Sequence, residues 1–207
     1  MYKWLFSLFL GIVSSTLALP VFSAGACGPP PGVNLDYLDP RNGGRLEVVE
    51  RVHFTDDVRS LRSGSTGYLA QDIEFVLNVF PNHHAGLDAM SRLVNREGTS
   101  QPRSARWPIE CRFHWARLRN ANDGMVSLIE GVHYHRLGNR AEARTHLKRA
   151  AELSPENPEV RYNVGLLLFR YGEHDAAYGH AKEAYAMGYP LPGLRNMLER
   201  AGYSLDD

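Results

Sequence analysis

The sequence predicts an all-α protein built from repeated helical hairpins. Four pairs of small residues recur 34 positions apart: Gly131 and Gly165, Gly138 and Gly172, Ala143 and Ala177, and Ala150 and Ala184. Apolar residues at helical spacing mark a further helix, with Leu69, Ile73, Val76, Leu77 and Phe80 on one face. A fixed period of this length is typical of helical arrays in which each unit packs on the next.

The repeated residue types have physical roles in such hairpins. Gly131 and Gly165 fall within predicted helices, where glycine costs about 1 kcal/mol relative to alanine, so we expect close helix contacts at both positions. Gly138 and Gly172 are expected to end the first helix of each hairpin in the left-handed conformation. Pro155 is expected to end a second helix and start the next unit.

These residues, at this period, resemble the tetratricopeptide repeat (TPR) family. The clearest repeats are residues 124–157 and 158–191, within a helical domain over residues 68–207. The resemblance implies a TPR-like helical hairpin solenoid, with an extended N-terminal arm and a C-terminal capping helix, whose role is to bind a partner. A helical hairpin with coincidental spacing is the alternative.

The N-terminus has the pattern of a signal peptide over residues 1–26. Lys3 is followed by a mainly apolar run, and Ala24 and Ala26 form a small-residue cleavage pattern before Cys27. The run is shorter than the ~20 apolar residues of a membrane span, although a membrane anchor is the alternative. We therefore expect export to the periplasm, with no stable membrane span after cleavage.

Cys27 and Cys111 are the two cysteines of the chain. In an oxidising compartment an even number of cysteines favours a disulfide, so we predict a Cys27–Cys111 bond. The residues before Cys27 also resemble a bacterial lipobox, and a lipoprotein modified at Cys27 would leave Cys111 unpaired. A lipid-anchored assembly factor is therefore an alternative.

Residues 27–67 are predicted to be an N-terminal arm followed by a short helix. Prolines at positions 29–31 disfavour helix, and residues 41–44 have the composition of a turn, so residues 27–52 are expected to be extended. Thr55 is a candidate N-cap, with Asp56 and Asp57 in the first helical turn.

Two further segments extend the repeat pattern. Ser91 lies in an amphipathic segment at the position that Gly131 and Gly165 occupy, and Phe113 and Ala116 precede Leu147 and Ala150 by 34 residues. These segments predict a degenerate hairpin with a long polar linker over residues 96–108. Residues 194–201 have one apolar face and are expected to cap the last repeat.

Several short segments resemble those of small exported proteobacterial TPR proteins with an uncharacterised role. They include Asp36-Tyr37, His53-Phe54-Thr55, Phe80-Pro81-Asn82-His83-His84 and Gly188-Tyr189-Pro190-Leu191-Pro192-Gly193-Leu194. This resemblance favours one continuous mature domain and implies no activity.

Composition and motifs argue against several functions. The chain has 23 basic and 23 acidic side chains, so it lacks the charge excess of a nucleic-acid-binding protein. It has no G-x-S-x-G, H-E-x-x-H or C-x-x-C motif, so we expect neither an enzyme nor a cofactor. His53, His83 and His84 define an alternative metal-binding hypothesis, against the simpler interpretation that the last two cap and pack a helix.

In TPR proteins the first helix of each unit lines the concave side of the solenoid. The resemblance therefore implies a groove formed by Arg92, Leu128, Val132, His135, Arg136, Tyr162, Leu166, Phe169 and Arg170. Arg96, Arg136 and Arg170 share one repeat position and suggest a ladder able to pair with carboxylates. The alternative is a solvated face over an ordinary apolar core.

The sequence thus predicts an exported TPR scaffold that binds a protein or peptide partner in its concave groove. Cell-envelope assembly or secretion is the expected setting, and the partner is of unknown identity.

Overall fold

The computed structural model describes residues 27–205, which form ten α-helices and no strand. The helices are α1 (Gly43–His53), α2 (Asp56–Arg59), α3 (Leu69–Val79), α4 (His84–Glu97), α5 (Ile109–Arg119), α6 (Gly124–Arg136), α7 (Arg140–Leu153), α8 (Pro158–Arg170), α9 (His174–Ala186) and α10 (Gly193–Arg200). The predicted signal peptide lies outside the described residues. Within the described part of the chain, no helix is both long and apolar enough to span a membrane.

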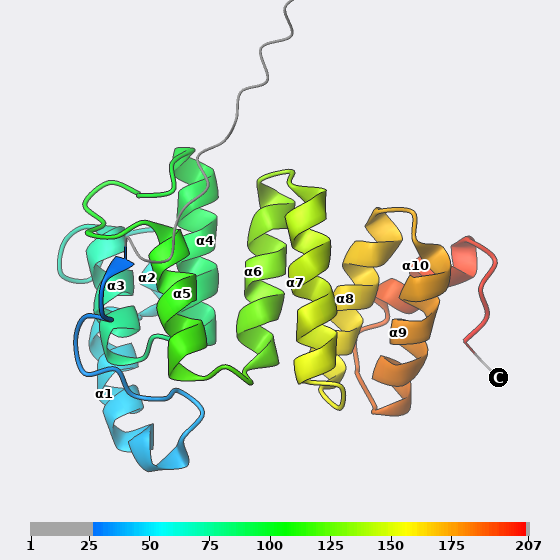
Figure 1. Cartoon of the computed structure of the whole chain (residues 1–207), viewed down its shortest axis with the longest axis horizontal. Helices are drawn as coiled ribbons and strands as arrows, with labels where there is room; N and C mark the ends of the chain where they lie inside the picture. Colours follow the sequence, from blue (N-terminus) through cyan, green and yellow to red (C-terminus); the bar gives the residue numbers. More distant parts are fainter. Residues whose placement is uncertain (1–26, 206–207) are drawn as a thin grey trace, which may run out of the picture.

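The helices form a row of hairpins along the long axis of the molecule (Figure 1). Helices α6 and α7 form one hairpin, α8 and α9 form the next, and α10 packs on both helices of the last hairpin. Helices α1 to α5 gather at the opposite end. The predicted helical solenoid with a C-terminal capping helix is confirmed.

Close packing inside each hairpin occurs at the repeated glycines. A Cβ atom on Gly131 would lie 3.1 Å from Leu147 Cγ, and one on Gly165 would lie 3.1 Å from the carbonyl oxygen of Ala177. Both distances are shorter than ordinary contacts, so the absence of a side chain lets the paired helices approach. The turns between them use left-handed glycines, with φ of +76° at Gly138 and +82° at Gly172.

The repeat period also applies to the helix starts. The Asp123 side chain accepts hydrogen bonds from the backbone N–H groups of Met125 and Val126 at the start of α6. Asn157, which lies 34 residues later, caps α8 in the same way. Each cap satisfies backbone donors that have no partner within the helix.

The N-terminal arm is shorter than predicted. Extended backbone gives way at Pro40 to a short 3₁₀-helix and then to α1, where we had expected an extended segment up to residue 52. Gly43 and Gly44 form the first turn of α1 despite their low helix propensity. Burial of Val49 and the packing of Leu46 against the core stabilise the helix, so tertiary contacts override the local signal.

The extended part of the arm lies across the end of α3. The Leu35 N–H donates to the carbonyl of Val79 at 2.7 Å, and the Tyr37 N–H donates to Asn82 Oδ1 at 2.9 Å. Asn82 is buried in the turn between α3 and α4. The arm is therefore fixed to the helical domain by backbone as well as side-chain contacts.

The α4–α5 hairpin carries the long linker that the sequence predicted. The linker is attached to the core by Glu74 of α3, whose carboxylate accepts from the N–H groups of Arg106 and Trp107. Glu74 also forms an ion pair of 2.6 Å with Arg112, and both side chains are buried. A buried pair of this kind becomes costly when one partner is removed.

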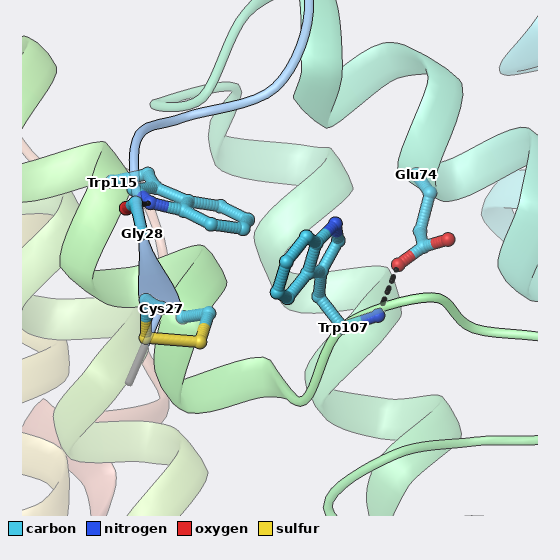
Figure 2. Close-up of a disulfide and its surroundings, with 6 residues drawn as sticks. Cys27, Gly28, Glu74, Trp107 and Trp115 are labelled. Carbon is cyan, nitrogen blue, oxygen red and sulfur yellow. Dashed lines mark hydrogen bonds between the residues drawn. A yellow bond between two sulfur atoms is a disulfide. The ribbon is translucent and has the colours of Figure 1, made fainter. Parts of the chain in front are cut away.

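A disulfide joins Cys27 to Cys111 and ties the start of the arm to α5 (Figure 2). Both cysteines are buried, and the Trp115 indole N–H donates to the carbonyl oxygen of Gly28 at 3.0 Å. Trp107 packs edge-on against Trp115. The predicted pairing is confirmed, and because Cys27 Sγ forms this bond it cannot also carry a thioether-linked lipid.

Candidate partner-binding groove

A hollow of about 400 Å³ opens between α4, α6 and α8. Its floor is formed by four residues of α6, namely Met125, Leu128, Ile129 and Val132. Their spacing of three and four residues places them on one face of the helix. Leu128 and Ile129 are buried, whereas Met125 and Val132 are half-buried, so the floor presents apolar surface to the hollow.

One wall carries an anchored arginine. Arg136 donates from Nη2 to Asp88 Oδ1 at 2.7 Å and from Nη1 to Ser91 Oγ at 2.9 Å. Asp88 also accepts from Arg92 Nε at 2.8 Å, so its carboxylate bridges two arginines. The Arg136 side chain is thereby held in one orientation at the edge of the hollow while remaining 23% exposed.

Ser91 connects this wall to the core. Its oxygen accepts from Arg136, and its hydroxyl contacts His133 Nδ1 at 3.0 Å. Because the hydroxyl proton is available to donate, the hydrogen bonds assign His133 Nδ1 as the acceptor. Burial, and then the charges of Arg136 and His146, lower the pKa of His133 to about 4.

The end of the hollow nearest the arm is polar. His84 Nε2 contacts Asp123 Oδ2 at 2.9 Å, and the same carboxylate accepts from Asn82 Nδ2 at 3.1 Å. Asn82 also donates to Asp36 of the arm at 2.8 Å. Since Asp123 caps α6 as well, this network connects the arm, α4 and the groove helix α6.

The opposite wall comes from the first two turns of α8. Glu159 and Asn163 line the hollow there, and the Asn163 side-chain amide donates to the carbonyl of Glu159. Glu159 is exposed and has no ion-pair partner among residues 27–205. The groove thus combines an apolar floor, one anchored arginine and one unpaired carboxylate.

The family model described as TPR repeat matches residues 131–172, which extend from the second half of α6 through α8. Residues 131–172 of this chain therefore contain a TPR repeat. No curated protein matches it. The TPR repeat indicates a scaffold for protein–protein interaction, and the hollow lies on the first helices of the TPR hairpins, α6 and α8.

Only some of the residues predicted to form the groove line the hollow between α4, α6 and α8. Leu128, Val132 and Arg136 line it, and Arg92 supports its wall through Asp88. The resemblance to TPR proteins therefore predicted three of the residues that line this hollow.

Tyr162 does not contribute to the groove, contrary to our expectation. It occupies the same repeat position as Leu128, but the residue is only 6% exposed and its ring packs on Tyr189 with ring centroids 4.4 Å apart. Tyr189, which precedes α10, and Gly193, the first residue of α10, cover this part of α8. The last TPR therefore has its equivalent surface filled by the chain itself.

The other predicted residues of α8, and His135 of α6, lie beyond the hollow. Leu166 and Phe169 pack against the C-terminal core, and the Phe169 ring stacks on His174 with centroids 4.4 Å apart. His135 is hydrogen-bonded to Tyr171 at 3.0 Å, and partial burial followed by nearby arginines lowers its pKa. Arg170 is exposed.

The proposed arginine ladder does not form. Arg96 donates to the carbonyl of Leu61 at 2.7 Å, Arg136 pairs with Asp88, and Arg170 is exposed. The three share a repeat position, but Arg96 and Arg136 are bound to different partners and Arg170 is exposed.

The histidines of the metal hypothesis are held by three separate carboxylates. His53 contacts Asp72, His83 contacts Glu50, and His84 contacts Asp123. In the part of the chain that the structure describes, no three His, Cys, Asp or Glu side chains are placed to hold one metal ion. The structure therefore does not bring His53, His83 and His84 together as the metal site of the alternative hypothesis.

His83 instead has a structural role at the start of α4. Its Nδ1 accepts from the Gly86 N–H at 2.9 Å, which leaves the proton on Nε2 to donate to Glu50. Burial lowers the pKa of His83 to about 4, outweighing the opposite effect of Glu50. This is the capping and packing role that the simpler interpretation predicted.

Sequence reasoning missed several residues of the hollow, among them Met125, Ile129, Glu159 and Asn163. The signal was present in the repeat: Met125 and Glu159 are 34 residues apart, as are Ile129 and Asn163. These two repeat positions face the groove in both the α6–α7 and the α8–α9 hairpin.

Proposed function

We propose that this protein is an exported TPR scaffold that binds a segment of another protein in the groove between α4, α6 and α8. Cell-envelope assembly or secretion is the setting we propose. The observation that carries the proposal is the apolar floor of α6 beside an arginine that is already fixed by Asp88 and Ser91.

The chemistry of the groove suits protein recognition. Apolar surface with an arginine anchor is typical of the few residues that contribute most to binding at interfaces. Because Arg136 is already oriented, a partner would lose less conformational entropy in forming a hydrogen bond with it. The volume of about 400 Å³ accommodates a few side chains of an extended segment or of one helix face.

The disulfide supports the proposed compartment. Disulfides persist mainly in oxidising compartments, and the Cys27–Cys111 bond is compatible with export. It also favours the form without lipid over the lipid-anchored alternative, since Cys27 Sγ is already bonded. The signal peptide over residues 1–26 remains a prediction of the sequence.

Affinity capture from the native envelope tests this proposal. We expect Val132→Asp, which places a charge on the apolar floor, to abolish capture of the partner or weaken it at least about tenfold. Glu159→Lys on the exposed wall should also change the capture of this partner. Lys182→Ala on the outer face of α9 is the matched control. Circular dichroism first confirms that each variant folds. Equal capture by all variants would contradict the groove assignment.

A further inference from the structure

A second hollow of about 410 Å³ lies between the arm, α1 and α3. Val33 of the arm, Val48 and Val52 of α1, and Phe75 of α3 all line it. None of these elements contributes to the groove floor. We call this feature the α1–α3 hollow.

The apolar side chains around the α1–α3 hollow are unusually exposed. Val33 is 56% exposed, Val48 47%, Val52 44% and Phe75 43%. Single exposed apolar residues are common, but a contiguous group around a hollow marks an interaction site. The exposed surface is therefore better explained by a partner than by the packing of this chain.

Phe75 is held in place for such a contact. Its ring stacks on His53 with centroids 3.8 Å apart, and His53 Nδ1 contacts Asp72 at 3.0 Å. Asp72 is buried and also accepts from the Thr66 hydroxyl and the Ser65 N–H. One face of the Phe75 ring is thus held by His53. A partner that contacts the ring therefore loses little conformational entropy by ordering it.

The rim of the α1–α3 hollow carries an uncompensated positive charge. Arg45 lines it, is exposed, and has no ion-pair partner among residues 27–205. The neighbouring arginines differ, because Arg41 pairs with Asp39 at 2.6 Å and Arg51 lies 3.9 Å from Glu47. The charge that complements this surface is therefore negative, and on a protein partner it is a carboxylate.

We infer that the α1–α3 hollow docks a segment of another protein, an amphipathic helix whose apolar face carries acidic residues at its edge. Its apolar side chains enter the hollow beside Phe75, and its carboxylate pairs with Arg45. This site is independent of the groove between α4, α6 and α8.

Charge and shape favour this occupant over two others. A twofold contact with a second copy would place the same surface against itself and bring two Arg45 side chains into one interface, and no residue that lines the hollow is acidic. A lipid surface accepts protruding side chains, whereas these residues surround a concavity that receives them.

Two synthetic helical peptides with an identical leucine face test the inference on the intact exported protein. One carries glutamates beside the leucines and the other carries lysines. We expect fluorescence anisotropy to show at least about tenfold tighter binding of the glutamate peptide, with the preference reversed by Arg45→Glu. Val48→Asp should abolish binding of both peptides. Leu118→Asp, which changes an apolar residue of α5 that is 62% exposed, should leave binding unchanged.

Several results would overturn the inference. Equal affinity for the two peptides, or a preference that Arg45→Glu does not alter, would remove the charge argument. Loss of peptide binding in the groove variant Glu159→Lys would place the peptide in the other site. A dimer seen in sedimentation velocity, or binding to phosphatidylglycerol vesicles, that Val48→Asp abolishes would assign the hollow to a second copy or to lipid.

Discussion

Substitution of Gly165 by leucine tests the close packing on which the repeat depends. A Cβ atom at this position would lie 2.8 Å from Leu194 Cδ2, 3.1 Å from the Ala177 carbonyl oxygen and 3.2 Å from His180 Cβ. Leu194 can move its flexible end, but the Ala177 oxygen belongs to the backbone of α9. Accommodating leucine would therefore require α9 and α10 to shift away from α8, at a cost of about 1–3 kcal/mol or more.

Gly179 provides a matched control. It lies within α9, its backbone φ is not positive, and a Cβ atom there would meet no heavy atom within 4 Å. Replacing either glycine by leucine gains a similar helix propensity, so the difference between the two variants isolates the packing cost. We expect Gly165→Leu to melt roughly 2–12 °C below Gly179→Leu in thermal unfolding followed by circular dichroism. Equal melting temperatures would refute the packing argument.

Three other predictions concern stability. Cys27→Ser opens a loop with a sequence separation of 84 residues and should lower the free energy of unfolding, measured with denaturant, by about 4.5 kcal/mol in the chain-entropy model. Glu74→Ala leaves the buried Arg112 without its carboxylate and should cost about 3–5 kcal/mol in the same assay. The unfolded His133 binds a proton near pH 6.5, whereas the folded residue does so only near pH 4, so stability should fall as pH drops between these values. His133→Asn should reduce the stability lost between these pH values by up to about 3 kcal/mol.

Distinct results would contradict each of these predictions. Free thiols on Cys27 and Cys111 in unreduced, denatured protein would exclude the disulfide. An unchanged unfolding midpoint for Glu74→Ala would show that the pair with Arg112 adds little. If the stability of His133→Asn showed the same pH dependence as that of the wild type, other titrating groups would be its cause.

The sequence contained enough information for the hairpins because their signals are local and periodic. The left-handed glycines at Gly138 and Gly172, the close packing at Gly131 and Gly165, and the break at Pro155 depend on the residue itself and its near neighbours. The disulfide could also be predicted from the sequence, since two cysteines allow a single pairing.

Helix α1 was missed because its stability comes from distant contacts. Its first residues, Gly43 and Gly44, have poor helix propensity, and only packing of Leu46 and Val49 on the core selects the helix. The polar network around Asn82 was equally hidden, since its partners Asp36 and Asp123 are 46 and 41 residues away.

Tyr162 shows where the repeat argument fails. A repeat position specifies the direction of a side chain, but not what covers it at the end of an array. Leu128 has another hairpin on each side, whereas Tyr162 lies under Tyr189 and the start of α10. Terminal repeats pack against unique segments, so groove residues transfer safely only between internal repeats.

Residue-specific photo-cross-linking in living cells tests most directly whether the α4–α6–α8 groove binds a partner. A photoreactive amino acid at Val132 reports on the groove floor, and one at Arg149, which is exposed on the outer helix α7, serves as the control. We predict that Val132 captures one partner, that mass spectrometry locates the adduct in a defined segment, and that Glu159→Lys reduces it. An adduct from Arg149, or from a probe at Val48 alone, with none from Val132, would contradict the groove assignment.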